Sequence, residues 1–177
     1  MDYPWYTKVP GDSRLEQGDI IFKCQIIEPI SEIEEENSTL AADVVEYDVI
    51  IMSQSCDLYY EKIELVLVCP FYSLTELSER YPSYKEEVMR KKLRQGAVVG
   101  YHLLNKDEKV GFNDYLIVDF KSVYAVPLKF LKKIALERGE RVRLLPPYRE
   151  HLSQAFARFF MRVGLPIDID LQDLIKR

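Results

Sequence analysis

Apolar positions in the first two thirds of the chain are spaced as in β-strands. In residues 20–26 the even positions are apolar, which predicts a half-buried strand that places Cys24 in the core. The ranges 44–53 and 63–70 contain continuous apolar runs, typical of strands buried on both sides. Further strand patterns follow at 98–104, 115–120 and 123–126, whereas residues 1–14 show no periodicity and predict an irregular arm.

Helical spacing dominates the later part of the chain. Ser73 and Glu76 match a capping box, and helix-compatible residues continue to Leu93 with an interruption near Pro82. A short helix is predicted at 128–136, and the clearest one lies between Pro147 and Gly164. One face of this last helix forms a core-facing apolar stripe: Tyr148, Leu152, Ala155, Phe156, Phe159 and Val163.

This order of elements predicts an α+β protein with mostly antiparallel strands, because the connections between strands are short and few are crossover helices. We expect a single domain over residues 1–177. Within it, residues 15–131 form the β-rich core with a helical insertion at 74–95, and residues 132–177 form a C-terminal helical extension.

Composition indicates an ordinary globular protein. The 177 residues are 47% apolar and 30% charged, enough for one sizeable core. The longest apolar runs are about five residues, so we expect no membrane span, and the N-terminus lacks the pattern of a secretory signal. Three cysteines without C-x-x-C spacing predict reduced thiols and a cytoplasmic location.

Charge is unevenly distributed along the chain. Residues 1–60 hold 3 Lys/Arg and 13 Asp/Glu, whereas residues 121–177 hold 12 and 6. Such asymmetry allows a basic face that binds nucleic acid. The alternative is that the acidic and basic parts face each other within one fold or between subunits. The net charge of −5 argues against non-specific duplex binding as the main activity.

The segment 54–57 is the first candidate for chemistry. It places a hydroxyl, the Cys56 thiol and the Asp57 carboxylate directly after a buried strand. Cys56 with one of the two histidines could form a nucleophile–base pair, and zinc bound by Cys56, Asp57 and the histidines is a weaker hypothesis. The alternative is a turn in which Ser55 or Asp57 bonds neighbouring backbone amides. Nucleotide-binding, metalloprotease and hydrolase motifs are missing from the sequence, and we expect neither metal nor cofactor.

A polar stripe on the last helix is the second candidate. Four residues lie within roughly 80° on the helical wheel and could bind phosphate: His151, Gln154, Arg158 and Arg162. The alternative is that these side chains form a solvated flank or pair with the acidic N-terminal third. An acidic run at 31–38 predicts a solvated loop.

Three segments together resemble MazF/PemK-like toxins: Gly18–Phe22, Val49–Ser53 and Leu67–Ser73, followed by residues 114–128 in the place of that family's closing strands. The resemblance covers residues 16–73 and 96–131. It implies a small, mostly antiparallel β-barrel of the Src-homology-3 type, single-stranded RNA as the family's substrate, metal-independent cleavage and a homodimer.

The chain departs from that family at the residues that carry catalysis. Tyr47 or Asp48 stands where the toxins have an arginine, and Tyr72 stands at their threonine position, so that only Ser73 matches. The cation that would stabilise a phosphate transition state is therefore missing from its expected place. The resemblance then implies that catalysis is lost, or that Arg158, His151 or Tyr72 supply it.

Two hypotheses follow from these observations. The first is a non-catalytic binding module for single-stranded RNA or DNA or for a protein partner, within a toxin–antitoxin or phage-defence system. The second is a metal-independent endoribonuclease whose catalytic residues are Cys56, Asp57, Tyr72 and Ser73. The missing arginine and threonine favour the first hypothesis, and the reactive side chains of residues 55–57 keep the second open.

Overall fold

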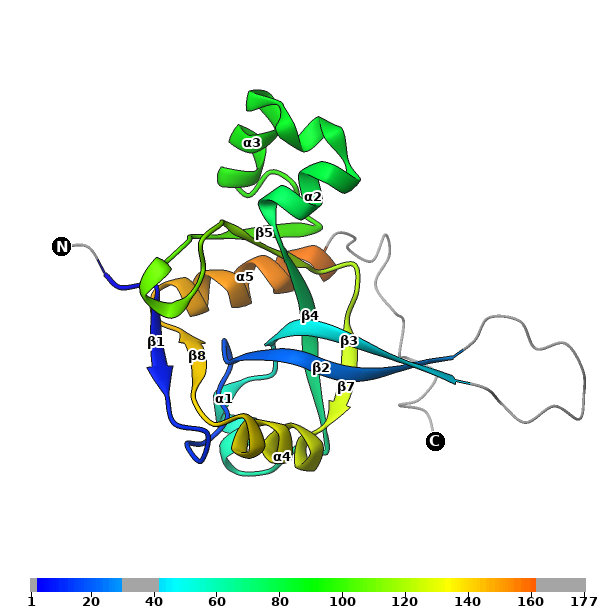
Figure 1. The fold of residues 1–177 in the computed structure, drawn as a ribbon, viewed down its shortest axis with the longest axis vertical. Coiled ribbons are helices and arrows are strands. Elements are labelled where there is room, and N and C mark those ends of the chain that lie inside the picture. Colours follow the sequence, from blue (N-terminus) through cyan, green and yellow to red (C-terminus); the bar gives the residue numbers. More distant parts are fainter. Residues whose placement is uncertain (1–2, 30–41, 162–177) are drawn as a thin grey trace, which may run out of the picture.

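The chain folds into an α+β structure of antiparallel strands flanked by helices, as Figure 1 shows. This computed structural model describes residues 3–29 and 42–161. The strands are β1 (Tyr6–Val9), β2 (Ile20–Pro29), β3 (Ala42–Ile51), β4 (Leu65–Ser73), β5 (Tyr101–Leu104), β6 (Leu116–Asp119), β7 (Tyr124–Pro127) and β8 (Arg141–Leu144). The helices are α1 (Ser55–Tyr59), α2 (Leu74–Arg80), α3 (Glu87–Arg94), α4 (Leu128–Arg138) and α5 (Tyr148–Phe160), with 3₁₀ turns η1 (Pro82–Lys85) and η2 (Glu108–Val110).

Strand β4 lies at the centre of the larger sheet. The strand order of this sheet is β2-β3-β4-β6-β5, and β7 also pairs with β4. Different stretches of β4 pair with β7 (Leu65–Val68), β3 (Val68–Pro70) and β6 (Phe71–Ser73). All of these pairings are antiparallel, as the short connections predicted.

A second, two-stranded sheet joins the first and last described strands. β1 pairs with β8, and β8 reaches the start of β2 through a bridge between Asp19 and Arg143. The Leu144 N–H also donates to the Gly18 carbonyl at 2.9 Å. Within residues 3–29 and 42–161, β1 and β5 do not pair, so the strand path stays open and a closed barrel is not confirmed.

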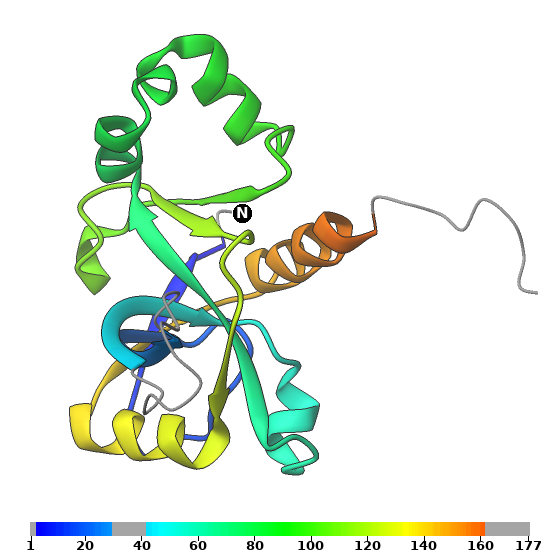
Figure 2. The same ribbon diagram turned by 90° about the vertical axis from the view of Figure 1, so that its right-hand side faces the viewer.

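Helices cover the sheets on several sides. Figures 1 and 2 place α4 at one end of the long axis, α2 and α3 at the other, and α5 between them. Leu131 of α4 is fully buried in a cluster with β2, β3 and β4, and Leu152 of α5 in a cluster that includes Phe120 and Leu144. Leu93 of α3 packs with Tyr101 of β5. Each helix thus buries an apolar stripe against strands. In the described part of the chain, no helix is both long and apolar enough to span a bilayer.

Several predicted elements are confirmed. β2 includes residues 20–26, and Cys24 is fully buried in it. α4 contains the predicted helix 128–136, and α5 begins directly after Pro147. The capping box is present, since the Ser73 hydroxyl accepts from the Glu76 N–H at 3.0 Å and the Glu76 carboxylate accepts from the Ser73 N–H at 2.7 Å. The acidic run 31–38 and the end of the last helix lie outside the described residues.

Short elements stabilised by distant partners were predicted incorrectly. Residues 1–14 are not only an irregular arm, because they include β1. The extension over 132–177 is not purely helical, because it includes β8, whose four residues alternate between arginine and apolar side chains. The connection after β3 contains the helix α1 rather than a polar loop alone. Local periodicity over four or five residues is too short to show that a partner strand is present.

Two further predictions differ from the structure in detail. The strand over 63–70 is not buried on both sides, because Leu65 and Leu67 are 55% and 40% exposed while Val66 and Val68 are fully buried. One side of this strand packs against the α4 cluster, and the other side faces solvent at Leu65 and Leu67 but is buried at Cys69. The helical stretch after Ser73 is divided into α2, η1 and α3, with the interruption at Pro82 as expected.

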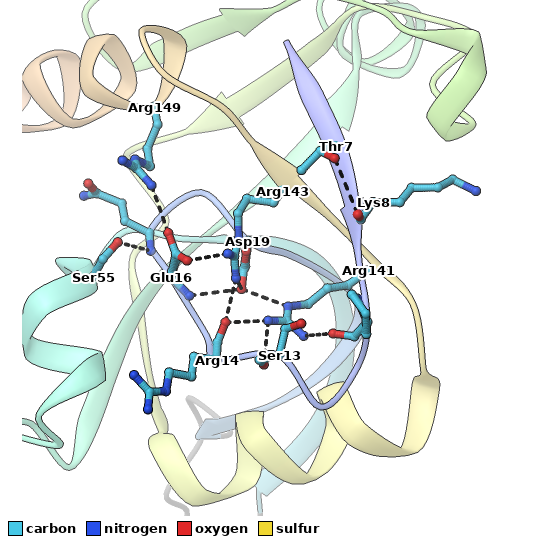
Figure 3. Close-up of polar contacts among 12 residues, drawn as sticks. Thr7, Lys8, Ser13, Arg14, Glu16, Asp19, Ser55, Arg141, Arg143 and Arg149 are labelled. Carbon is cyan, nitrogen blue, oxygen red and sulfur yellow. Dashed lines mark hydrogen bonds and ion pairs between the residues drawn. The ribbon is translucent and has the colours of Figure 1, made fainter. Parts of the chain in front are cut away.

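The most buried polar contact joins the acidic N-terminal part to the basic C-terminal part (Figure 3). Asp19 is 0% exposed and its Oδ2 accepts from Arg141 Nε at 2.8 Å. The remaining guanidinium donors of Arg141 bond the carbonyl oxygens of Pro10, Gly11, Ser13 and Arg14 at 2.7–3.2 Å. A single arginine on β8 therefore orients the loop that connects β1 to β2.

Two more arginines extend this cluster. Arg143 Nε donates to Asp19 Oδ1 at 2.5 Å, and Arg143 also pairs with Glu16. Arg149, in the first turn of α5, pairs with the other oxygen of Glu16 at 3.0 Å. The uneven charge of the sequence is thus partly explained by internal pairing, which was the alternative to a nucleic-acid-binding face.

We expect Asp19→Asn to lower the free energy of unfolding by about 3 kcal/mol. The change keeps the size of the side chain but leaves the buried guanidinium of Arg141 without its negative partner. Urea denaturation followed by circular dichroism measures the effect. The control is Lys8→Met, which removes a surface pair with Glu140 and should change stability by less than about 1 kcal/mol. Equal losses in the two variants would contradict the central role of Asp19.

Candidate functional site

The segment 53–57 is held by hydrogen bonds to backbone amides of other parts of the chain. The Ser53 hydroxyl accepts from the Leu67 N–H at 2.9 Å, and the Ser55 hydroxyl accepts from the Gln17 N–H at 3.1 Å. Cys56 is exposed, and its thiol lies 3.8 Å from the Asp57 carboxylate. The Ser55 hydroxyl thus has a structural role, as the turn alternative expected, but the segment forms the helix α1 and the amide that Ser55 bonds is 38 residues away rather than a neighbour.

Tyr72 and Ser73 lie at the opposite end of β4 from this segment. Figures 1 and 2 both place α1, which contains Cys56 and Asp57, near one end of the long axis, and α2, which follows Ser73, near the other. The structure therefore does not bring the four predicted catalytic residues into one site. The Ser73 hydroxyl is the N-cap of α2, and burial raises the pKa of Tyr72.

The groove at Tyr72 and Ser73 is acidic. Its described lining contains four carboxylates and no lysine or arginine; the carboxylates belong to Glu46, Asp48, Glu76 and Asp114. Tyr47 and Asp48, the two positions at which the resemblance would put the toxins' arginine, both line this groove. The guanidinium of Arg80 lies 5.1 Å from the centre of the Tyr72 ring, but the four carboxylates outnumber this cation, so the geometry does not favour phosphate binding or RNA cleavage here.

A larger cavity lies between β5, the end of α3 and α5. Its volume is about 870 Å³, which is in the range of small-molecule sites. Two residues of the predicted polar stripe, His151 and Arg158, line it. Gln154 is exposed on the same helix but does not line the cavity, and Arg162 lies outside the described residues.

His102 of β5 is the most unusual side chain in this cavity. It is 6% exposed, and its Nε2 has no hydrogen-bond partner among the described residues. Its ring stacks near Phe120 and lies 5.1 Å from the ring of His151. Burial, with smaller contributions from His151 and Arg158, lowers the pKa of His102 to about 4. The imidazole is therefore neutral at pH 7 and has an unused polar atom.

The cavity has a positive rim and aromatic walls. Arg94 at the end of α3 and Arg158 on α5 are exposed, and neither forms an ion pair with another described residue. Among the described lining residues there is no aspartate or glutamate. The aromatic lining residues are Trp5, Tyr101, Tyr115 and Phe120. This combination attracts anions that also carry a planar apolar group.

Contacts between distant segments hold the walls in place. The Trp5 ring stacks on Tyr148 of α5 with centroids 3.6 Å apart and planes at 9°. The Trp5 carbonyl accepts from the Leu145 N–H at 2.8 Å. The segment before β1 is therefore fixed against the start of α5, beside the cavity. In the part of the chain that the structure describes, no three His, Cys, Asp or Glu residues group together as a metal site would require.

Sequence reasoning identified one wall of this cavity and missed the others. The stripe on α5 was visible as a helical pattern, but His102 was considered only as a partner of Cys56, and Arg94 and Trp5 were not candidates. The only available signal was that the chain has two histidines, one in a predicted strand and one in a predicted helix. Nothing in local spacing shows that their rings meet.

Comparisons with known proteins do not assign the chain to a family. No protein-family model matches the chain, and no curated protein matches it either. The resemblance to MazF/PemK-like toxins therefore remains a prediction from short motifs.

We expect the neutral His102 to make stability depend on pH. An unfolded histidine titrates near pH 6.5 and the folded His102 near 4, so only the unfolded chain binds a proton between these values. The contribution of neutral His102 to the free energy of unfolding is therefore fully present above pH 6.5 and is lost as the pH falls toward 4. When the pH is lowered from 7 to 5, the free energy of unfolding should fall by about 2 kcal/mol more in the wild type than in His102→Gln. Urea denaturation at the two pH values measures this difference.

The matched control is His151→Gln, because His151 is exposed on α5. This variant should keep most of the wild-type difference between the two pH values, because burial is the largest cause of the lowered pKa of His102. If His102→Gln shows the same pH dependence as the wild type, His102 is not held neutral in the folded protein.

Proposed function

We propose that this protein is a non-catalytic binding module for single-stranded nucleic acid, with the cavity between β5 and α5 as its binding site. The observation that carries the proposal is the lining of the cavity. It combines Arg94, Arg158 and His151 with aromatic walls and, among the described residues, has no carboxylate.

The chemistry of the lining fits a single strand better than a duplex. Guanidinium groups bind phosphate oxygens in a bidentate manner, and aromatic side chains stack on unpaired bases. A cavity can accept a base only where the base is not paired within a helix. The net charge of −5 supports a local site rather than a general attraction to duplexes.

The proposal extends to the class of protein suggested by the resemblance. In this hypothesis the sheets belong to a divergent MazF/PemK-like barrel in a cytoplasmic protein that forms a homodimer. A toxin–antitoxin or phage-defence system is then its setting. The antiparallel order around β4 and the bridge from β8 to β2 support this interpretation. The separation of Cys56 and Asp57 from Tyr72 and Ser73 supports the absence of catalysis at those residues.

A second candidate function is metal-independent RNA cleavage in the same cavity. The observation in its favour is the 5.1 Å distance between the rings of His102 and His151, with Arg158 beside them. One imidazole would take the proton of a ribose 2′-hydroxyl as its oxygen bonds phosphorus. The other would give a proton to the 5′-oxygen as the P–O5′ bond breaks.

We expect Arg158→Gln to weaken binding of short single-stranded RNA and DNA to a similar extent for every sequence. The variant loses one phosphate contact, so the slope of log affinity against log salt should become shallower by about 0.7. Fluorescence anisotropy over a series of KCl concentrations measures both quantities. Lys129→Gln is the control, since it removes an exposed cation of α4 outside the cavity. If the wild type binds neither RNA nor DNA, the proposal fails and a protein partner becomes the hypothesis to test.

We expect a mixed pool of single-stranded RNA to remain intact when incubated with the wild type in EDTA. Electrophoresis of end-labelled strands checks this outcome. Cleavage by the wild type that is lost in both His102→Gln and His151→Gln would replace the binding module by the second candidate. Cleavage that depends instead on Cys56 or Ser73, tested with Cys56→Ala and Ser73→Ala, would point to the sites predicted from the sequence.

A further inference from the structure

We propose that the cavity takes one unstacked base of the bound strand, with the base edge against His102 and the adjoining phosphate at the rim. This inference rests on the proposed function and adds the orientation of the ligand and the group that reads it. It follows because the buried residues of the cavity lining are uncharged, whereas the arginines of the lining are exposed at the rim.

The floor of the cavity is apolar and neutral. His102 and Tyr101 are each 6% exposed, Leu93 is 2% exposed and Phe120 is 1% exposed. The only described polar atom there that is buried without a partner is His102 Nε2. An unpartnered polar atom at a buried site costs free energy until a ligand bonds it. The floor therefore favours a ligand group that is planar, uncharged and able to form a hydrogen bond.

A phosphate does not fit that description. Moving it to the floor would strip water from two charged oxygens, and a neutral imidazole offers at most one hydrogen bond in return. A base edge carries neutral donors and acceptors, so it can pair with Nε2 in either tautomer of the ring. The faces of the base would lie among the aromatic walls.

The rim suits the phosphate for the opposite reason. Arg94, His151 and Arg158 are exposed, so a phosphate beside them keeps part of its hydration. A guanidinium can hold two of the phosphate oxygens at once. One nucleotide thus spans the cavity with its base inward, and the rest of the strand continues in solvent.

In this orientation the base contacts the floor of the cavity and the phosphate contacts the rim, and strands that differ only in their bases can distinguish the two contacts. Short strands with one test base (A, C, G or U) among abasic residues keep the phosphates constant, and a fully abasic strand removes every base. We expect the best base to bind about tenfold more tightly than the abasic strand, measured by fluorescence anisotropy. In His102→Phe the preference among the four bases should disappear, while Arg158→Gln should weaken all five strands by the same factor.

The two histidines provide a second readout that uses only the wild-type protein, so it does not require any variant to fold. Because the chain has only His102 and His151, their imidazole signals can be followed by NMR in the wild type. A base-bearing strand should shift both sets of signals, whereas the abasic strand should shift those of His151 alone.

The outcomes separate this inference from the proposed function. If all five strands bind equally and the His102 signals stay in place, nucleic acid is bound but its base does not enter the cavity, and the inference is overturned. If no strand binds, the proposed function fails as well. A preference among bases that persists in His102→Phe would also reject His102 as the reading group.

Discussion

The buried carboxylate of Asp19 ties the start of β2 to β8 and so joins the two sheets. It lies between Arg141 and Arg143 of β8, and Arg141 bonds four carbonyls of the preceding loop. A carboxylate without water must have such partners, so only one placement of β8 against the start of β2 satisfies it. β8 leads directly into α5, and the position of α5 follows from the same contact.

The candidate site lies along α5, the helix that follows β8. Arg149, at the start of α5, continues the ion-pair cluster through Glu16. Two and nine residues further along, the same helix presents His151 and Arg158 to the cavity. Trp5 reaches the cavity because its carbonyl bonds Leu145 and its ring stacks on Tyr148. The fold thus uses some of its C-terminal cations internally and leaves others at the rim of a cavity.

Charge also distinguishes the groove at Tyr72 from the cavity at His102. The groove at Tyr72 and Ser73 contains carboxylates, and the cavity at His102 contains cations. An anionic ligand is repelled by the first and attracted by the second. A motif-based search leads to the acidic groove, because the resemblance aligns Tyr72 and Ser73 with a catalytic pair. The physical properties of the side chains point to the other region.

The sequence by itself determined the elements whose pattern is long and local. The α+β class, β2, the capping box at Ser73, α4 and the stripe of α5 follow from periodicity and capping, which depend on neighbours within a few residues. β1, β8 and the cavity did not follow from it. β1 and β8 are four residues each and pair across more than a hundred positions, as Tyr6 with Leu144 shows. His102 becomes unusual only where α5 covers it, since burial and the approach of His151 come from the tertiary structure. Local sequence patterns indicate which face of a helix or strand is apolar. Which other element packs against that face depends on contacts between segments that are distant in the sequence.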